Sequence, residues 1–298
     1  MVTATIQTSP AQSTFLNRIS VLLLLSSLWC TLPLAVQALS TPLYGSAAPE
    51  ISTERANHVG SLLNEAFSSL NGDSVQRYAT AREMAKLSQP TMPSHELVYG
   101  ELSVPVLATI LDAVGVRKGD AFLDIGSGDG ALVLGAAMMY PDFLRASRGL
   151  ELVPGLVDRS VRHRTILEER QALTVPTEFC HGDVHGSEPA VLDILGDTTL
   201  AVCFATTWSA GNAAIDRKDG EETHGAHGKP RKRNDLQGRS LPKLSKALAR
   251  MPDGARIVVV DGRLNRENGH QWEGDLRIDC PDTAPFSIAS LYRLHNSV

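Results

Sequence analysis

Cysteine is scarce in this chain of 298 residues, which contains only Cys30, Cys180, Cys203 and Cys280. No two of them form a C-x-x-C pair, and neither His181 and His185 nor His224 and His227 have a cysteine at zinc-ligand spacing beside them. Zinc sites need such closely spaced ligands, so no metal site is predicted. The second and third cysteines lie in apolar runs and are expected to be buried thiols.

An excess of positive charge is lacking as well. The formal net charge is −5, which argues against non-specific binding of nucleic acid over the whole surface. The chain is 43% hydrophobic and 20% charged, a composition that suits folding around an apolar core. Its length suits one α/β domain of about 200 to 250 residues with extensions.

A long apolar run lies near the start, from Ile19 to Ser40, after a Ser/Thr-rich segment with one cation, Arg18. Serines and Pro33 interrupt the run, which ends in Val36-Gln37-Ala38, the small-x-small pattern of a signal peptidase site. We therefore predict a signal or targeting segment over residues 1–38. The alternative is an uncleaved anchor, since the run is nearly long enough to span a bilayer.

Residues 39–94 are predicted to form a linker and N-terminal helices. The stretch 41–50, TPLYGSAAPE, is typical of a linker. Apolar residues at helical spacing predict an amphipathic helix over 52–70 and a second helix over 74–88. A proline-punctuated loop, 88–100, leads into the main domain, which we place at 95–298.

Strand and helix patterns alternate in the main domain. Ser103 is expected to cap a helix that Gly115 ends. Five strands are then predicted, in the segments 120–126, 148–153, 177–184, 199–207 and 255–264. This alternation predicts a largely parallel sheet with helices on both faces. Two more strand patterns, 276–280 and 286–295, have no helix between them and predict a closing antiparallel hairpin. The expected fold is an α/β, Rossmann-like, seven-stranded sheet.

The segment 213–240, between the fourth and fifth strands, is charged, rich in glycine and nearly free of large apolar residues. We expect it to be a mobile surface loop. Its run Arg231-Lys232-Arg233 is expected to be solvated.

The stretch FLDIGSGDG, residues 122–130, carries the main functional signal. An apolar strand leads into a turn at Gly126, Gly128 and Gly130, and a helix pattern follows. Glycine allows positive φ and a close ligand approach, and a helix N-terminus offers free N–H groups. This context predicts a cofactor loop, with a purely structural turn as the alternative.

Two cofactors compete for this loop. The segment also fits the G-x-G-x-x-A dinucleotide fingerprint, and either cofactor needs an acid such as Glu151 at the second strand's end, to accept the ribose hydroxyls. S-adenosylmethionine is favoured because Asp124 precedes the loop and Asp129 lies within it. This donor carries a sulfonium and an ammonium rather than a pyrophosphate. After the third strand, Asp183 can accept from the adenine amino group, with Val184 against the ring.

The segment VYGELS, 98–103, precedes the glycine loop and supports a resemblance to a known family. The pairing resembles the disruptor-of-telomeric-silencing type of non-SET histone lysine methyltransferase, a class I S-adenosylmethionine-dependent methyltransferase. In that family a V-Y-G-E-T segment covers the methionine part of the donor, whereas this chain has Leu102 in place of the threonine. The segments 248–264 and 290–296 also resemble the family, so the resemblance covers roughly 95–298.

The resemblance implies a set of donor-binding residues. They are Tyr99, Glu101, Asp124, Gly126, Ser127, Gly128, Gly130, Glu151, Asp183 and Val184. After the fourth strand the family has two asparagines and a phenylalanine beside the methyl-transfer site, but this chain has Phe204-Ala205-Thr206-Thr207-Trp208. Thr206 and Thr207 are the candidates to replace the asparagines, and Tyr292 matches the family's final strand. These three are the predicted catalytic residues.

The predicted function is S-adenosylmethionine-dependent methyl transfer, with a protein lysine as the acceptor. Three alternatives stay open: methylation of a small molecule, a nicotinamide-dependent reductase, and donor binding without catalysis. The expected partner is a protein with an exposed lysine, and membrane contact is expected only through the N-terminal segment.

The targeting segment and the donor together predict a location. S-adenosylmethionine is made inside cells, so a secreted enzyme would lack it. We expect entry into the secretory route, followed by a plastid reached through a bipartite leader or by retention in endomembranes. A fluorescent fusion of the full chain should mark one of these compartments, and a fusion lacking residues 1–38 should not. Nuclear fluorescence of the full-length fusion would contradict this expectation.

Overall fold

The computed structural model describes residues 47–71, 74–89, 102–205, 240–280 and 284–295. The predicted targeting segment, 1–38, and nearly all of the charged loop, 213–240, lie outside these residues. Within the part of the chain that is described, no helix is long and apolar enough to cross a membrane.

Three helices precede the sheet. Helices α3 (Thr53–Asn71) and α4 (Ser74–Ser88) confirm the two N-terminal helices predicted from periodicity. Helix α5 (Val104–Val114) ends, as predicted, at Gly115 in the left-handed conformation. Ser103 is the N-cap residue of α5, as predicted, but its side chain makes no capping hydrogen bond. A proline in the first turn lacks an N–H group, so fewer donors there need a cap.

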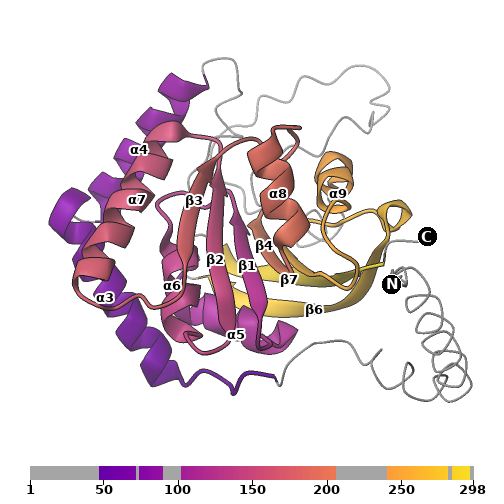
Figure 1. Ribbon diagram of the computed structural model, residues 1–298, viewed down its shortest axis with the longest axis horizontal. Coiled ribbons are helices and arrows are strands. Elements are labelled where there is room, and N and C mark those ends of the chain that lie inside the picture. Colours follow the sequence, from indigo (N-terminus) through magenta and orange to yellow (C-terminus); the bar gives the residue numbers. More distant parts are fainter. Residues whose placement is uncertain (1–46, 72–73, 90–101, 206–239, 281–283, 296–298) are drawn as a thin grey trace, which may run out of the picture. The chain divides into compact units, whose positions relative to one another are not determined.

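A seven-stranded sheet forms the centre of the fold, in the order β3-β2-β1-β4-β5-β7-β6 (Figure 1). Neighbours from β3 to β5 pair in parallel, and β7 pairs antiparallel with both β5 and β6. The strands are β1 (Asp120–Ile125), β2 (Leu144–Glu151), β3 (Thr177–His181), β4 (Leu200–Phe204), β5 (Arg256–Val260), β6 (His270–Cys280) and β7 (Ala284–Leu294). The predicted fold class and the closing hairpin are confirmed.

Helices cover both faces of the sheet (Figure 1). Helices α6 (Ala131–Met139) and α7 (Pro154–Glu169) pack on the same side as α3 and α5. Helices α8 (Pro189–Asp197) and α9 (Pro242–Leu248) cover the other face. A single 3₁₀ turn, Arg266–Asn268, precedes β6. The sequence analysis did not identify α8 and α9. Helix α9, with seven residues, is too short to show a clear apolar period.

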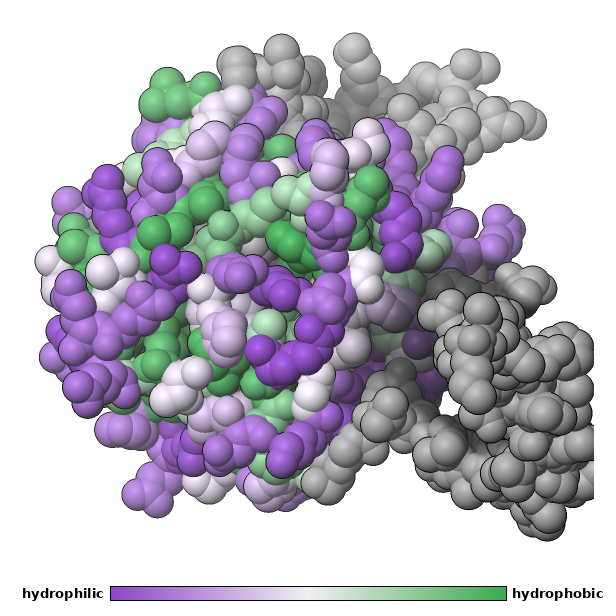
Figure 2. Space-filling view, in the orientation of Figure 1, coloured by the Kyte–Doolittle hydropathy of each residue, from purple (hydrophilic) through white to green (hydrophobic). Residues whose placement is uncertain are grey.

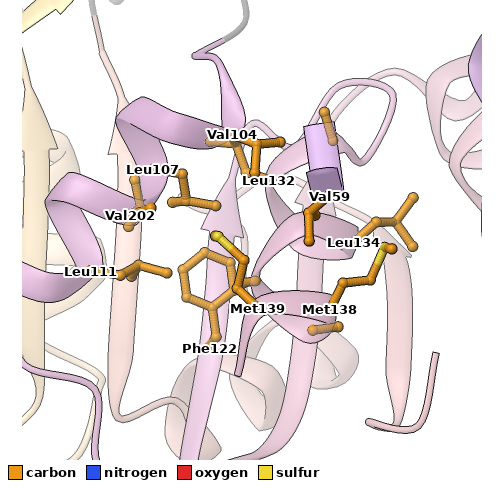
Figure 3. Close-up of a cluster of buried hydrophobic side chains, with 14 of the residues drawn as sticks. Val59, Val104, Leu107, Leu111, Phe122, Leu132, Leu134, Met138, Met139 and Val202 are labelled. Carbon is orange, nitrogen blue, oxygen red and sulfur yellow. The ribbon is translucent and has the colours of Figure 1, made fainter. Parts of the chain in front are cut away.

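The larger core cluster joins the N-terminal helices to the sheet. In Figure 3, Leu107 of α5, Met139 of α6 and Val59 of α3 gather with Phe122 of β1. Fully burying side chains of this size contributes about 1.5–3 kcal/mol each. Helix α3 is therefore part of the same core as the sheet that carries the glycine loop.

The surface is mixed in character. On the face that Figure 2 presents, apolar areas are separated by polar residues. Among the described residues, the exposed large apolar side chains are Leu70, Val75, Leu87, Leu192 and Trp272. They come from α3, α4, α8 and β6, so the exposed apolar surface of these residues is divided rather than gathered on one element.

A buried ion pair holds the end of the sheet where the parallel strands begin. Arg256, the first residue of β5, is fully buried and donates to both carboxylate oxygens of Asp120, the first residue of β1. Its guanidinium also donates to the carbonyl of Gly115, just after α5. The Asp120 carboxylate accepts a further hydrogen bond from the Thr199 hydroxyl at 2.8 Å. The Arg256–Asp120 ion pair therefore connects β1, β5 and the end of α5.

We predict that Arg256→Leu lowers the free energy of unfolding by about 3–5 kcal/mol, because it leaves the Asp120 carboxylate buried without its partner. The matched control is Arg293→Leu. Arg293 lies opposite Arg256 in the sheet register but pairs with Glu273 near the surface, so its loss should cost about 1 kcal/mol or less. Urea unfolding measures both, and equal losses would contradict the prediction.

Candidate functional site

The glycine loop, 126–130, joins β1 to α6 at the edge where the parallel strands end. Strand β1 lies between β2 and β4, so the strand order reverses at this point, and ligands of open α/β sheets bind at such reversals. Gly126, Gly128 and Gly130 have φ of 79°, 53° and 86°. The positive φ expected of these glycines is therefore present.

The carboxylate of Glu151 closes the loop against β2. Its oxygens accept hydrogen bonds from the N–H groups of Gly128 at 2.8 Å and Val153 at 2.9 Å. The residue is 8% exposed. Burial raises the pKa of the Glu151 carboxyl, and backbone hydrogen bonds from Val153, Gly128 and Leu152 oppose this. A carboxylate offers about four lone-pair positions, so acceptor capacity remains and the ribose-binding role stays a prediction.

Three predicted acidic residues occupy the ends of adjacent strands. Asp124 is almost fully buried near the end of β1, opposite Gly149 of β2 in the register. Glu151 ends β2, and Asp183 follows β3 by two residues. Asp183 is exposed, and its Oδ1 accepts the N–H of His185 at 2.9 Å. The fold thus brings these carboxylates to the edge of the sheet that carries the glycine loop.

Asp129 differs from what its place in the motif led us to expect. Its side chain is fully buried and accepts a hydrogen bond from Arg159 Nη2 of α7 at 2.7 Å. Asp129 was expected to disfavour a pyrophosphate beside the loop, but a side chain paired with Arg159 in the interior does not discriminate between the two cofactors. The carboxylate is turned to the protein interior, where the guanidinium compensates the cost of burying a charge.

Tyr292 is packed in the core, although the resemblance placed it among the catalytic residues. It lies opposite Ile257 in β5, three strands from β1 in the sheet order. The side chain is buried, and its hydroxyl accepts the N–H of Leu264 at 3.2 Å. We correct its assignment to that of a core residue.

Val184 also packs inward, in the core cluster that contains Leu150 and Val191. Its carbonyl accepts a hydrogen bond from Arg250. A place against the adenine ring stays a prediction for Val184. Tyr99, Glu101, Thr206 and Thr207 lie outside the described residues.

Helix α7 supports the loop from beneath, a contribution that the sequence did not reveal. The Ser160 hydroxyl donates to the Gly128 carbonyl at 2.9 Å. His163 Nδ1 lies 3.1 Å from the Asp129 carbonyl, to which it donates. Together with Arg159, these residues form the buried polar face of a helix whose other positions are largely polar too, so periodicity alone could not single them out.

Close packing under the loop explains Gly130 and Gly149. A Cβ on Gly130 would lie 2.7 Å from the Phe179 ring, and a Cβ on Gly149 would lie 2.5 Å from Ser127 Oγ. An isolated glycine within a strand is a known sign of such close approach, and it was the available signal for Gly149. The predicted binding residue Ser127 is buried, and its hydroxyl has no hydrogen-bond partner among the described residues.

The described residues fit an S-adenosylmethionine donor. The loop backbone adopts the positive φ that permits close approach of a ligand. The carboxylates of Asp124, Glu151 and Asp183 supply acceptors suited to an ammonium group, a ribose diol and an adenine amino group. No group of three or more metal-ligating side chains occurs within the described ranges.

Comparison with known proteins agrees with this site. The model of the family described as histone methylation protein DOT1 matches residues 78–174, about a third of the chain. The matched part contains the glycine loop, Glu151 and α7. The chain is a class I methyltransferase that resembles this family over the matched segment. Its fold is that of the class I methyltransferases, and its cofactor is S-adenosyl-L-methionine.

Other comparisons add context to this methyltransferase. No curated protein matches it. Similar solved structures include an RNA methyltransferase from Salinibacter ruber in complex with S-adenosyl-L-homocysteine, at 18% identity and a TM-score of 0.41, which covers 67% of this chain and 96% of that chain. YjhP from E. coli has 12% identity and a TM-score of 0.42, covering 72% and 100%.

We predict that Gly130→Ala lowers the free energy of unfolding of the methyltransferase by about 2–5 kcal/mol, through left-handed strain and collision with Phe179. In a Phe179→Leu background the same substitution should cost only about 1–2 kcal/mol, since the left-handed strain and the looser contact with Ser160 Cβ at 3.1 Å remain. Gly196→Ala is the control, because a Cβ there meets nothing within 4 Å. Urea unfolding should show it neutral or stabilising, and a cost of Gly130→Ala unchanged by the Phe179 variant would refute the steric account.

Proposed function

We propose that this chain is an S-adenosylmethionine-dependent protein-lysine N-methyltransferase. The observation that carries the proposal is the match of the DOT1 family model to the segment containing the glycine loop, Glu151 and α7. That family is described by histone methylation, which supports a lysine of a basic protein as the acceptor. The VYGELS segment, 98–103, supports the same family by resemblance.

The donor's parts are assigned to named residues under this proposal. Asp124 and the loop 126–130 hold the methionine end, Glu151 the ribose and Asp183 the adenine. When bound, S-adenosylmethionine supplies a methyl carbon made electrophilic by a cationic sulfur. The assignment agrees with the burial of each acid, because Asp183 at the outer end of the site is exposed whereas Asp124 is buried.

The protein's task is alignment and exclusion of water. Holding two reactants in a productive geometry removes much of the barrier to their reaction. The loop suits this task because Glu151 and Ser160 fix its backbone from two sides.

The lysine must lose its proton before it accepts a methyl group. Burial lowers the pKa of an amine, and a nearby anion raises it. Under the proposal, Thr206 and Thr207 supply uncharged hydroxyl or carbonyl acceptors for the amine, in place of the family's asparagines. Uncharged acceptors orient the amine without stabilising its protonated form as strongly as a carboxylate would.

The test is methyl transfer from radiolabelled donor to a whole-cell extract, separated afterwards into protein, nucleic acid and organic fractions. The full-length chain should label a discrete protein band, and the labelled residue should be lysine. Asp183→Asn should weaken donor binding about tenfold, the value of a hydrogen bond to a charged group. Glu151→Ala sets the background.

The control for folding is Asp193→Asn, an exposed aspartate on α8. It should leave labelling and donor affinity unchanged. Label in the organic or nucleic acid fraction would show that the methyl acceptor is a small molecule or a nucleic acid and would contradict the proposed protein lysine. Donor binding without label in any fraction would contradict the enzymatic proposal.

A further inference from the structure

Asp129 receives charged partners from two different helices. Arg159 of α7 donates to its Oδ2 at 2.7 Å, and Arg77 Nε of α4 lies 3.7 Å from the same oxygen. All three residues are at most 5% exposed. A charge so deeply buried is tolerated only when it is paired, so the carboxylate is strongly attached to both helices.

Arg77 is itself held by aromatic rings of the N-terminal helices. Its guanidinium lies 4.9 Å from the ring centre of Phe67 in α3 and 5.4 Å from that of Tyr78 in α4. Such contacts stabilise a guanidinium, the more so when it is desolvated. One carboxylate faces two guanidinium groups here, and the ring contacts help to compensate the surplus positive charge.

A second connection runs in parallel. The Phe67 ring stacks on His163 at a centroid distance of 4.0 Å, and His163 donates to the Asp129 carbonyl. Burial lowers the pKa of His163 to about 4, so this side chain is neutral near pH 7 and adds no charge to the cluster. Phe67 of α3 is thus connected to the Asp129 carboxylate through Arg77 and to the Asp129 carbonyl through His163.

Asp129 lies between Gly128 and Gly130, both with positive φ. Glycine has little conformational preference of its own, so the loop needs outside contacts to hold one shape. We propose that Arg77 is a positioning residue that acts through Asp129, so that docked helix α4 sets the affinity of the glycine loop for S-adenosylmethionine. The inference rests on the proposed function, since it assumes that the loop binds this donor.

The test compares full-length variants by calorimetric titration with S-adenosylhomocysteine, by donor KM and kcat, and by Tm. Arg77→Met should raise the Kd and the donor KM about tenfold, while kcat at saturating donor is retained. Arg77→Lys should restore part of the affinity, because it keeps a cation near Asp129 but lacks the planar guanidinium. Lys86→Met, an exposed position on the same helix, should change nothing.

The Val59→Ala variant distinguishes a general loss of stability in the N-terminal helices from a specific effect on donor affinity. Val59 is buried on α3 in the core cluster of Figure 3 and is no member of the Asp129 cluster. This variant should lower Tm and leave the Kd unchanged. A Kd that rises in Val59→Ala in proportion to the lost Tm would overturn the inference, since affinity would then follow stability alone.

A double variant tests the route through Asp129. If Arg77 acts through this carboxylate, Arg77→Met with Asp129→Asn should bind no more weakly than Asp129→Asn alone. Losses that multiply would contradict this route. If Arg77→Met does not fold, Arg77→Lys carries the comparison and should still raise the Kd measurably.

The two proposals fail in different ways. A wild-type chain that binds neither S-adenosylmethionine nor S-adenosylhomocysteine overturns the proposed function and this inference with it. A wild-type chain that binds both, with an Arg77→Met variant of equal affinity, overturns the inference alone.

Discussion

The edge of the sheet that carries the glycine loop depends on the hydrogen bonds that the Glu151 carboxylate accepts. It accepts the N–H of Gly128 from the loop and that of Val153 from the turn before α7. A buried carboxylate is stable only when hydrogen-bonded. Glu151 at the end of β2 therefore needs the closed loop for its hydrogen bonds, and the loop needs Glu151 to stay closed. The same edge lies where the strand order reverses between β1 and β4, and ligands of open α/β sheets bind at such reversals.

Carboxylates near this edge perform different tasks according to what surrounds them. Glu151 is satisfied by backbone N–H groups, Asp129 by guanidinium groups, and exposed Asp183 by a single N–H and solvent. Asp120, at the opposite end of the strands, is buried with Arg256. Asp120 and Asp129 are thus compensated within the protein by guanidinium groups, and Asp183 is the most accessible of these acids.

Methyl transfer asks little of a protein beyond alignment of donor and acceptor. A loop held by side chains from α7 and β2 meets that demand, and it places the donor's recognition in the part of the chain that matches the DOT1 family. The choice of acceptor depends on other residues. The sequence after β4 has Thr206 and Thr207 where the resembling family has asparagines, so the acceptor side is where this chain departs from that family.

Local patterns in the sequence determined the class of fold, the two N-terminal helices, the closing hairpin and the glycine loop, because each depends on periodicity or on φ preferences of neighbouring residues. Such patterns could not reveal α9, which is too short to show a period. Only the tertiary structure decided that Asp129 turns inward to Arg77 and Arg159, and that Tyr292 belongs to the core. The physical reason is that burial of a charge or a ring depends on partners distant in the chain, which spacing along the sequence does not encode.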